Sequence, residues 1–91
     1  MNYFITLSDQ AELDLDETNK YYSELSHELL ERFWIDLNST IERLVENPLH
    51  FQERYQRTRI IFLKNFPFGI HYILNGEEVE VFRILHAKRE F

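Results

Sequence analysis

The dipeptide Asn75-Gly76 limits most strongly how this chain folds, because it separates two runs rich in β-branched and aromatic residues. Asn-Gly favours a two-residue type I′ hairpin loop, in which both central residues need a positive φ. Taking these residues as the loop sets the expected cross-strand pairs, which are Leu74 with Glu77, Tyr72 with Val79, His71 with Glu80, Ile70 with Val81 and Phe68 with Arg83.

This pairing divides the hairpin into two surfaces, because side chains alternate across a strand. One surface is expected to face the core and carries Phe68, Ile70, Tyr72, Val79 and Val81, with Arg83 at its end. The other surface mixes polar and apolar groups, namely Gly69, His71, Ile73, Glu78, Glu80, Phe82, Ile84 and His86. Adjacent exposed apolar side chains usually mark a binding surface, so we expect this second surface to bind a partner.

The remaining chain predicts two strands and a pair of helices. Residues 2–7 and 59–64 read as strands, and residues 49–58 as a polar connection. The first helix begins at Ser8-Asp9, where Asp9 and Glu12 have capping-box spacing. Ser26 is the expected N-cap of the second helix, which ends at Asn47-Pro48 because the residue before proline avoids the helical region. The order β-α-α-β-β-β predicts one α+β domain over residues 1–91, in two layers, with an N-terminal strand and an α-helical hairpin packed on an antiparallel β-sheet.

Composition excludes several classes of protein. The chain has no cysteine, so it cannot supply a thiolate nucleophile or a cysteine-type zinc site. No apolar run approaches the ~18 residues of a membrane span, and no signal-peptide pattern opens the chain, so we expect a cytoplasmic protein without a membrane partner. The net charge of −6 is uneven: residues 1–56 carry 4 basic and 12 acidic side chains, whereas residues 57–91 carry 6 basic and 4 acidic ones.

Two clusters in the last third carry candidate chemistry. His71 and Glu80 are expected to be cross-strand neighbours, with His86 on the same face; they would form an acid/base pair or, as the favoured interpretation, an ordinary charge pair. A metal site at these three residues is the weakest interpretation, and we expect neither metal nor cofactor. Arg83, Lys88 and Arg89 join His86 in a basic cluster that would bind an anion or an acidic partner, or simply solubilise the terminus.

Two sequence blocks resemble a known family. They are Phe66-Pro67-Phe68-Gly69-Ile70-His71-Tyr72 and the block from Val81 to Arg89, and they follow a helical pattern that ends at Asn47-Pro48. With these blocks the chain resembles, over nearly its whole length, the RelE/ParE superfamily of type II toxin–antitoxin toxins. The resemblance implies a bacterial toxin that a small cognate antitoxin neutralises in a hetero-oligomer.

The resemblance also divides the candidate functions. RelE-like members cleave mRNA on the ribosome with several basic side chains, whereas ParE-like members poison DNA gyrase and lack that set. The nuclease lysines align with Ile60 and Phe62, and an arginine aligns with Gly69, so only Arg89 keeps a basic position. We therefore expect a ParE-like, non-enzymatic toxin of a plasmid-stabilisation module.

The contacts of this toxin with antitoxin or target are expected at His71, Glu80, Phe82, Arg83, Ile84 and Lys88. One alternative is a ribosome-dependent endoribonuclease with His86 and Arg89 as catalytic residues. The other alternative is a decayed toxin retained as an antitoxin-binding protein.

Overall fold

Two serines begin the two helices of this protein, whose residues 2–87 are described by a computed structural model. Ser8 caps α1 (Asp9–Leu25) by accepting a hydrogen bond from the Ala11 N–H, and Ser26 caps α2 (His27–Glu46) by accepting one from the Leu29 N–H. The predicted Ser26 cap and the helix end before Pro48 are confirmed. The predicted capping box is wrong, because the capping side chain is Ser8 and the residue three positions later is Ala11.

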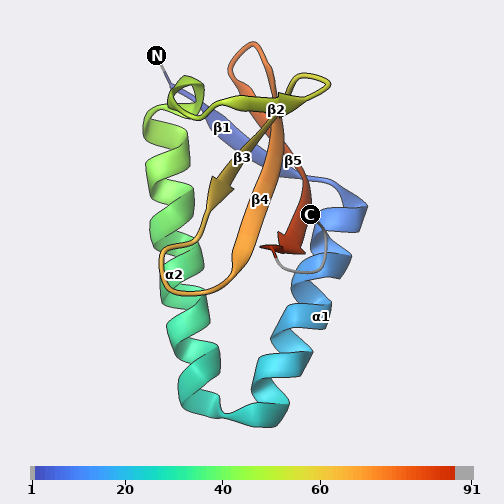
Figure 1. Ribbon diagram of the computed structural model, residues 1–91, viewed down its shortest axis with the longest axis vertical. Helices are drawn as coiled ribbons and strands as arrows, with labels where there is room; N and C mark the ends of the chain where they lie inside the picture. The colour runs from blue at the N-terminus through green and yellow to red at the C-terminus, as the bar shows by residue number, and fades with distance from the viewer. Residues whose placement is uncertain (1, 88–91) are drawn as a thin grey trace.

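The strands form a single five-stranded sheet in the order β1-β5-β4-β3-β2 (Figure 1). Their bounds are β1 Phe4–Leu7, β2 Glu53–Tyr55, β3 Thr58–Phe62, β4 Phe68–Asn75 and β5 Glu78–His86, and a short 3₁₀ helix, η1, spans Pro48–His50. β1 pairs with β5 in parallel, and the other pairs are antiparallel. The predicted two-layer α+β fold is confirmed, with β2 as one strand more than the sequence indicated.

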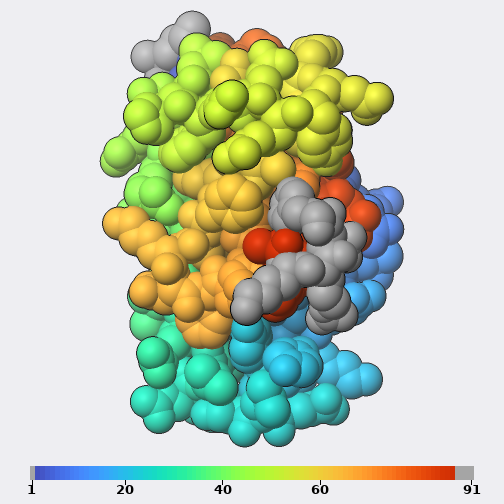
Figure 2. Space-filling view, viewed as in Figure 1, coloured from blue at the N-terminus to red at the C-terminus, as the bar shows by residue number. Residues whose placement is uncertain are grey.

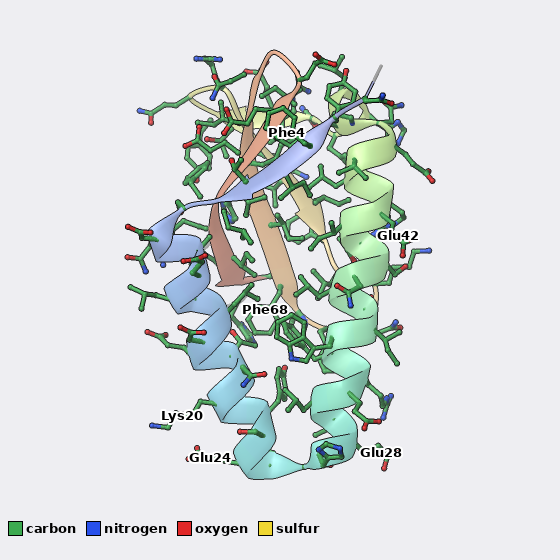
Figure 3. The ribbon with its side chains drawn as sticks, turned by 180° about the vertical axis from the view of Figure 1, so that it is seen from behind. Phe4, Lys20, Glu24, Glu28, Glu42 and Phe68 are labelled. Atoms are coloured by element: carbon green, nitrogen blue, oxygen red, sulfur yellow. The ribbon has the colours of Figure 1, made fainter. Side chains whose placement is uncertain are left out.

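The core lies between the helix hairpin and one face of the sheet. The Phe33 ring of α2 lies 5.4 to 5.6 Å, between centroids, from the rings of Tyr22, Phe66 and Phe68. Figure 3 shows Phe68 reaching into the space between the two helices. Tyr72 and Val79 are fully buried in the same cluster, as predicted. The Tyr72 hydroxyl donates a hydrogen bond to the Pro48 carbonyl, which ties β4 to the segment after α2.

The loop of the last hairpin is Gly76-Glu77 rather than Asn75-Gly76. Asn75 remains in β4 and pairs with Glu78, while Gly76 has a φ of +61°. A hairpin loop that opens with glycine needs positive φ at that first position only, so Asn75 is left to extend the strand. The expected partners of Leu74 and Tyr72 on β5 therefore move by two residues, and Tyr72 faces Val81. An even shift preserves the faces, which is why Tyr72 and Val79 are still in the core.

A β-bulge at Phe82 then moves the register by one further residue. Tyr72 pairs with Val81 but His71 pairs with Arg83, so Phe82 is the inserted residue. An odd shift exchanges the faces beyond the bulge, and Ile84 pairs with Ile70 in the core with 3% of its surface exposed. The predicted positions of Ile84 and His86 on the mixed surface, and of Arg83 at the end of the core surface, are therefore wrong.

Candidate functional site

The outer face is the side of the sheet that the helices leave uncovered, and it consists of Ile60, Phe62, Gly69, His71 and Phe82. Strand alternation separates it from the core: Ile61 and Ile70 pair beneath the helices, whereas Ile60 pairs with His71 and Phe62 with Gly69 on the other side. Figure 2 views the molecule from this side, with the segment that precedes β3 lying across one end.

β2 covers part of the outer face, although the sequence indicated an irregular connection there. Gln56 and Arg57 form the two-residue loop between β2 and β3, with φ values of 42° and 65°. This loop brings the Tyr55 hydroxyl within 3.1 Å of His71 Nδ1. Tyr55 is 45% exposed and His71 is 2% exposed, so the tyrosine shields the imidazole from water and presents its own ring.

Phe62 covers the neighbouring part of the outer face. A Cβ atom placed on Gly69 would lie 3.0 Å from Ile60 Cγ2 and 3.1 Å from Phe62 Cε1, so glycine lets these side chains pack closely on the β4 backbone. The Arg54 guanidinium lies over the Phe62 ring, 6.0 Å from its centroid, at the outer limit of a cation–π contact. Phe62 is 40% exposed, so its ring contacts the sheet and is still accessible to a partner.

Asp14 of α1 forms hydrogen bonds with the two residues of β5 that follow the bulge at Phe82. Its carboxylate accepts hydrogen bonds from Arg83 Nε and the Ile84 N–H, both at 2.9 Å, and from Arg83 Nη2 at 3.2 Å. Burial would raise the pKa of this carboxyl, but the hydrogen bonds from Arg83, Ile84 and Gln10 together hold the pKa below its usual value. Asp14 therefore stays ionised at neutral pH and ties Arg83 to the helix.

The predicted His71–Glu80 pair does not form. His71 pairs with Arg83, whereas Glu80 pairs with Ile73 on β4 and with Thr6 on β1, and accepts a hydrogen bond from the Asn75 side chain. The two-residue shift at the hairpin loop and the bulge at Phe82 are the physical reason.

His86 lies away from both His71 and Glu80, on the helix side of the sheet. Its ring packs against Phe68 with centroids 5.2 Å apart, and it lines a groove of about 400 Å³ with Thr18, Tyr21 and Tyr22 of α1. The predicted His71, Glu80 and His86 constellation is therefore divided among three places.

The predicted contact residues are likewise only partly gathered. Phe82 lies on the outer face, with its ring centroid 6.3 Å from that of His71. Ile84 is core and Arg83 is bound to Asp14, while Lys88 and Arg89 lie outside the described residues. Within residues 2–87, no three His, Cys, Asp or Glu side chains gather as metal ligands. No helix in that same range is long and apolar enough to cross a membrane.

Sequence reasoning missed Asp14, Arg54, Tyr55 and Phe62. The sequence does indicate that Asp14 is buried, because it lies three residues after Ala11 and four before Thr18, both of which are on the buried stripe of α1. The hairpin that presents Tyr55 had no usual signal, since its loop is Gln-Arg rather than a pair rich in Gly or Asn.

The comparisons agree with this fold. Residues 5–91 match the family model described as "ParE toxin of type II toxin-antitoxin system, parDE". A search of curated proteins finds no match. Among solved structures, the chain is similar to one titled "Chromosomal ParDE TA system from P. aeruginosa", with a TM-score of 0.77 and 20% identity, covering 92% of this chain and 95% of that one. The family match extends over nearly the whole sequence, and the chain therefore belongs to the ParE toxin family of type II toxin–antitoxin systems.

Proposed function

We propose that this toxin acts on DNA gyrase and does not cleave ribosome-bound mRNA. The observation that carries the proposal is the apolar character of the outer face at the positions where nuclease relatives are expected to hold cations. Stabilising the charge of a phosphodiester in its transition state needs positive groups close to the scissile phosphate. Ile60 and Phe62 stand at the two lysine positions, and Ile60 is only 5% exposed.

Gly69, at the position expected to hold an arginine in nuclease relatives, also argues against mRNA cleavage. An arginine in place of Gly69 would place its Cβ 3.0 and 3.1 Å from atoms of Ile60 and Phe62, so these side chains would have to shift by a few tenths of an ångström. Tyr55 and His71 do form a hydrogen-bonded pair nearby, but Arg83, in register with His71, is bound to the Asp14 carboxylate. The guanidinium of Arg83 is therefore engaged by a carboxylate, which reduces its capacity to stabilise the charge of a scissile phosphate.

The residual nuclease candidates do not favour the alternative either. His86 lines the groove beside α1, on the helix side of the sheet, and is not part of the outer face. Arg89, the other candidate, lies outside the described residues. We retain mRNA cleavage as the competing function that an experiment must exclude.

The family implies an antitoxin partner. We propose that the two proteins form a hetero-oligomer in the bacterial cytoplasm, where gyrase acts, and that Phe82 belongs to the contact surface. Glu80 lies at the β1 side of the same hairpin and would extend this contact, and Lys88, which is outside the described residues, is proposed as a further contact.

The test is growth arrest in a bacterial strain that carries a DNA-damage reporter, with primer extension on abundant mRNAs in the same cells. We expect arrest, reporter induction and no codon-specific cuts. Codon-specific cuts that disappear in Arg89→Ala would replace the proposal with the nuclease function. Absence of any arrest would instead support a decayed toxin that only binds antitoxin.

A further inference from the structure

Positive charge is concentrated in one segment of the toxin. We define the basic hairpin as residues 53–64, which comprise β2, β3 and their flanks. It carries Arg54, Arg57, Arg59 and Lys64 against one acidic residue, Glu53. The helical residues 9–46 carry 11 acidic and 3 basic side chains. The toxin therefore has strongly opposed charges on its helices and on its basic hairpin, despite a net charge of −6.

Two exposed aromatic rings lie within this basic segment, and both rest on the outer face. Tyr55 is held by its hydrogen bond to His71, and Phe62 rests on the position of Gly69 beneath the Arg54 guanidinium. Arg57 is exposed and donates a hydrogen bond to the Leu74 carbonyl, which holds the loop against β4. Aromatic and arginine side chains already fixed in place lose little entropy on binding, and they dominate the energetics of protein interfaces.

Charge decides which partner fits this surface. A partner that presents basic side chains would be repelled by the basic hairpin and attracted by the acidic helices. A partner for the basic hairpin must instead carry acidic side chains, together with apolar groups that pack on Tyr55 and Phe62.

We propose that the basic hairpin and the outer face bind an acidic segment of the antitoxin, with an apolar side chain seated between Tyr55 and Phe62. This inference rests on the proposed function, because it assigns one surface of the toxin to the antitoxin and leaves another for the target. Acidic residues of the antitoxin meet Arg54 and Arg57, so both affinity and association rate fall with salt.

The test is calorimetric titration of the purified toxin with the product of the small reading frame adjacent to its own. The apolar variant is Phe62→Ser, with Phe4→Ser as its control, because Phe4 is 55% exposed on β1 at the opposite edge of the sheet. The charge variant is Arg54→Glu with Arg57→Glu. Its control is Lys20→Glu with Arg32→Glu, which changes the net charge equally on the exposed helix surface.

Both hairpin variants are expected to weaken binding at least tenfold, and both controls to stay within twofold, with native circular dichroism throughout. The charge variant is also expected to lose most of the salt dependence of the affinity. If Phe62→Ser fails to fold, the charge variant decides alone, because Arg54 and Arg57 are exposed.

Unchanged affinity in the charge variant overturns the inference and leaves the proposed function standing. The inference is also overturned if the hairpin variants lose gyrase inhibition or self-association while antitoxin affinity is unchanged, because the surface then serves the target or a second copy. A wild-type toxin that neither binds the adjacent product nor arrests growth overturns the proposed function as well.

Discussion

At the residue scale, Tyr72 couples the sheet to the end of α2. Its side chain is fully buried, and its hydroxyl donates to the Pro48 carbonyl. Burial raises the pKa of Tyr72 to about 12, against a smaller opposing effect of Arg59. A buried phenolate would be shielded from water and could no longer donate to the Pro48 carbonyl, so the neutral form is part of the folded state.

This pKa predicts a loss of stability at alkaline pH. The folded pKa lies above the unfolded value of 10, so the contribution of Tyr72 is complete below pH 10 and falls as pH rises toward 12. We expect the free energy of unfolding of the wild type to fall by about 2–3 kcal/mol more over this window than that of Tyr72→Phe. Denaturant unfolding at several pH values measures the difference. Parallel pH profiles for the two proteins would show that Tyr72 ionises in the folded state as easily as in the unfolded one.

At the scale of elements, the pairing of α1 with β5 depends on Asp14. We expect Asp14→Asn to cost about 2 kcal/mol of unfolding free energy, because the buried acceptor loses its charge beside Arg83. The matched control is Asp16→Asn, which is exposed on the same helix and is expected to cost less than about 0.5 kcal/mol. Urea unfolding of the two variants gives the comparison.

The same pair has a defined pH dependence. The folded pKa of Asp14 is lowered, so its contribution is complete above the unfolded value of 3.8 and is lost as pH falls through the folded pKa. The difference between wild type and Asp14→Asn should therefore shrink in acid. A difference that is constant from pH 7 to pH 3 would mean that the asparagine disrupts packing rather than an ionic contact.

The elements also show how far the sequence allows prediction. Helix ends, the core face around Tyr72 and the two-layer fold follow from local signals at Ser26, Pro48 and the alternating strands. The bulge at Phe82 has no local signal, because it depends on Asp14, which is 68 residues away in the chain. The bulge places Ile84 in the core, so Ile84 is removed from the predicted contact surface.

At the scale of the whole molecule, the toxin presents two chemically different sides. The helices offer acidic side chains, and the outer face with the basic hairpin offers aromatic rings beside arginines. A toxin built in this way can bind a basic target and an acidic antitoxin through separate surfaces. Neutralisation would then follow from an obstructed approach to the target and not from competition for identical residues.

The central claim is that this protein inhibits DNA gyrase and leaves mRNA intact. The direct measurement is ATP-dependent supercoiling of relaxed plasmid by purified gyrase with increasing amounts of toxin, beside translating ribosomes given the same toxin. We predict loss of supercoiling, its recovery when antitoxin is added, and full-length mRNA on the ribosomes. Undiminished supercoiling together with cleaved mRNA would contradict the account.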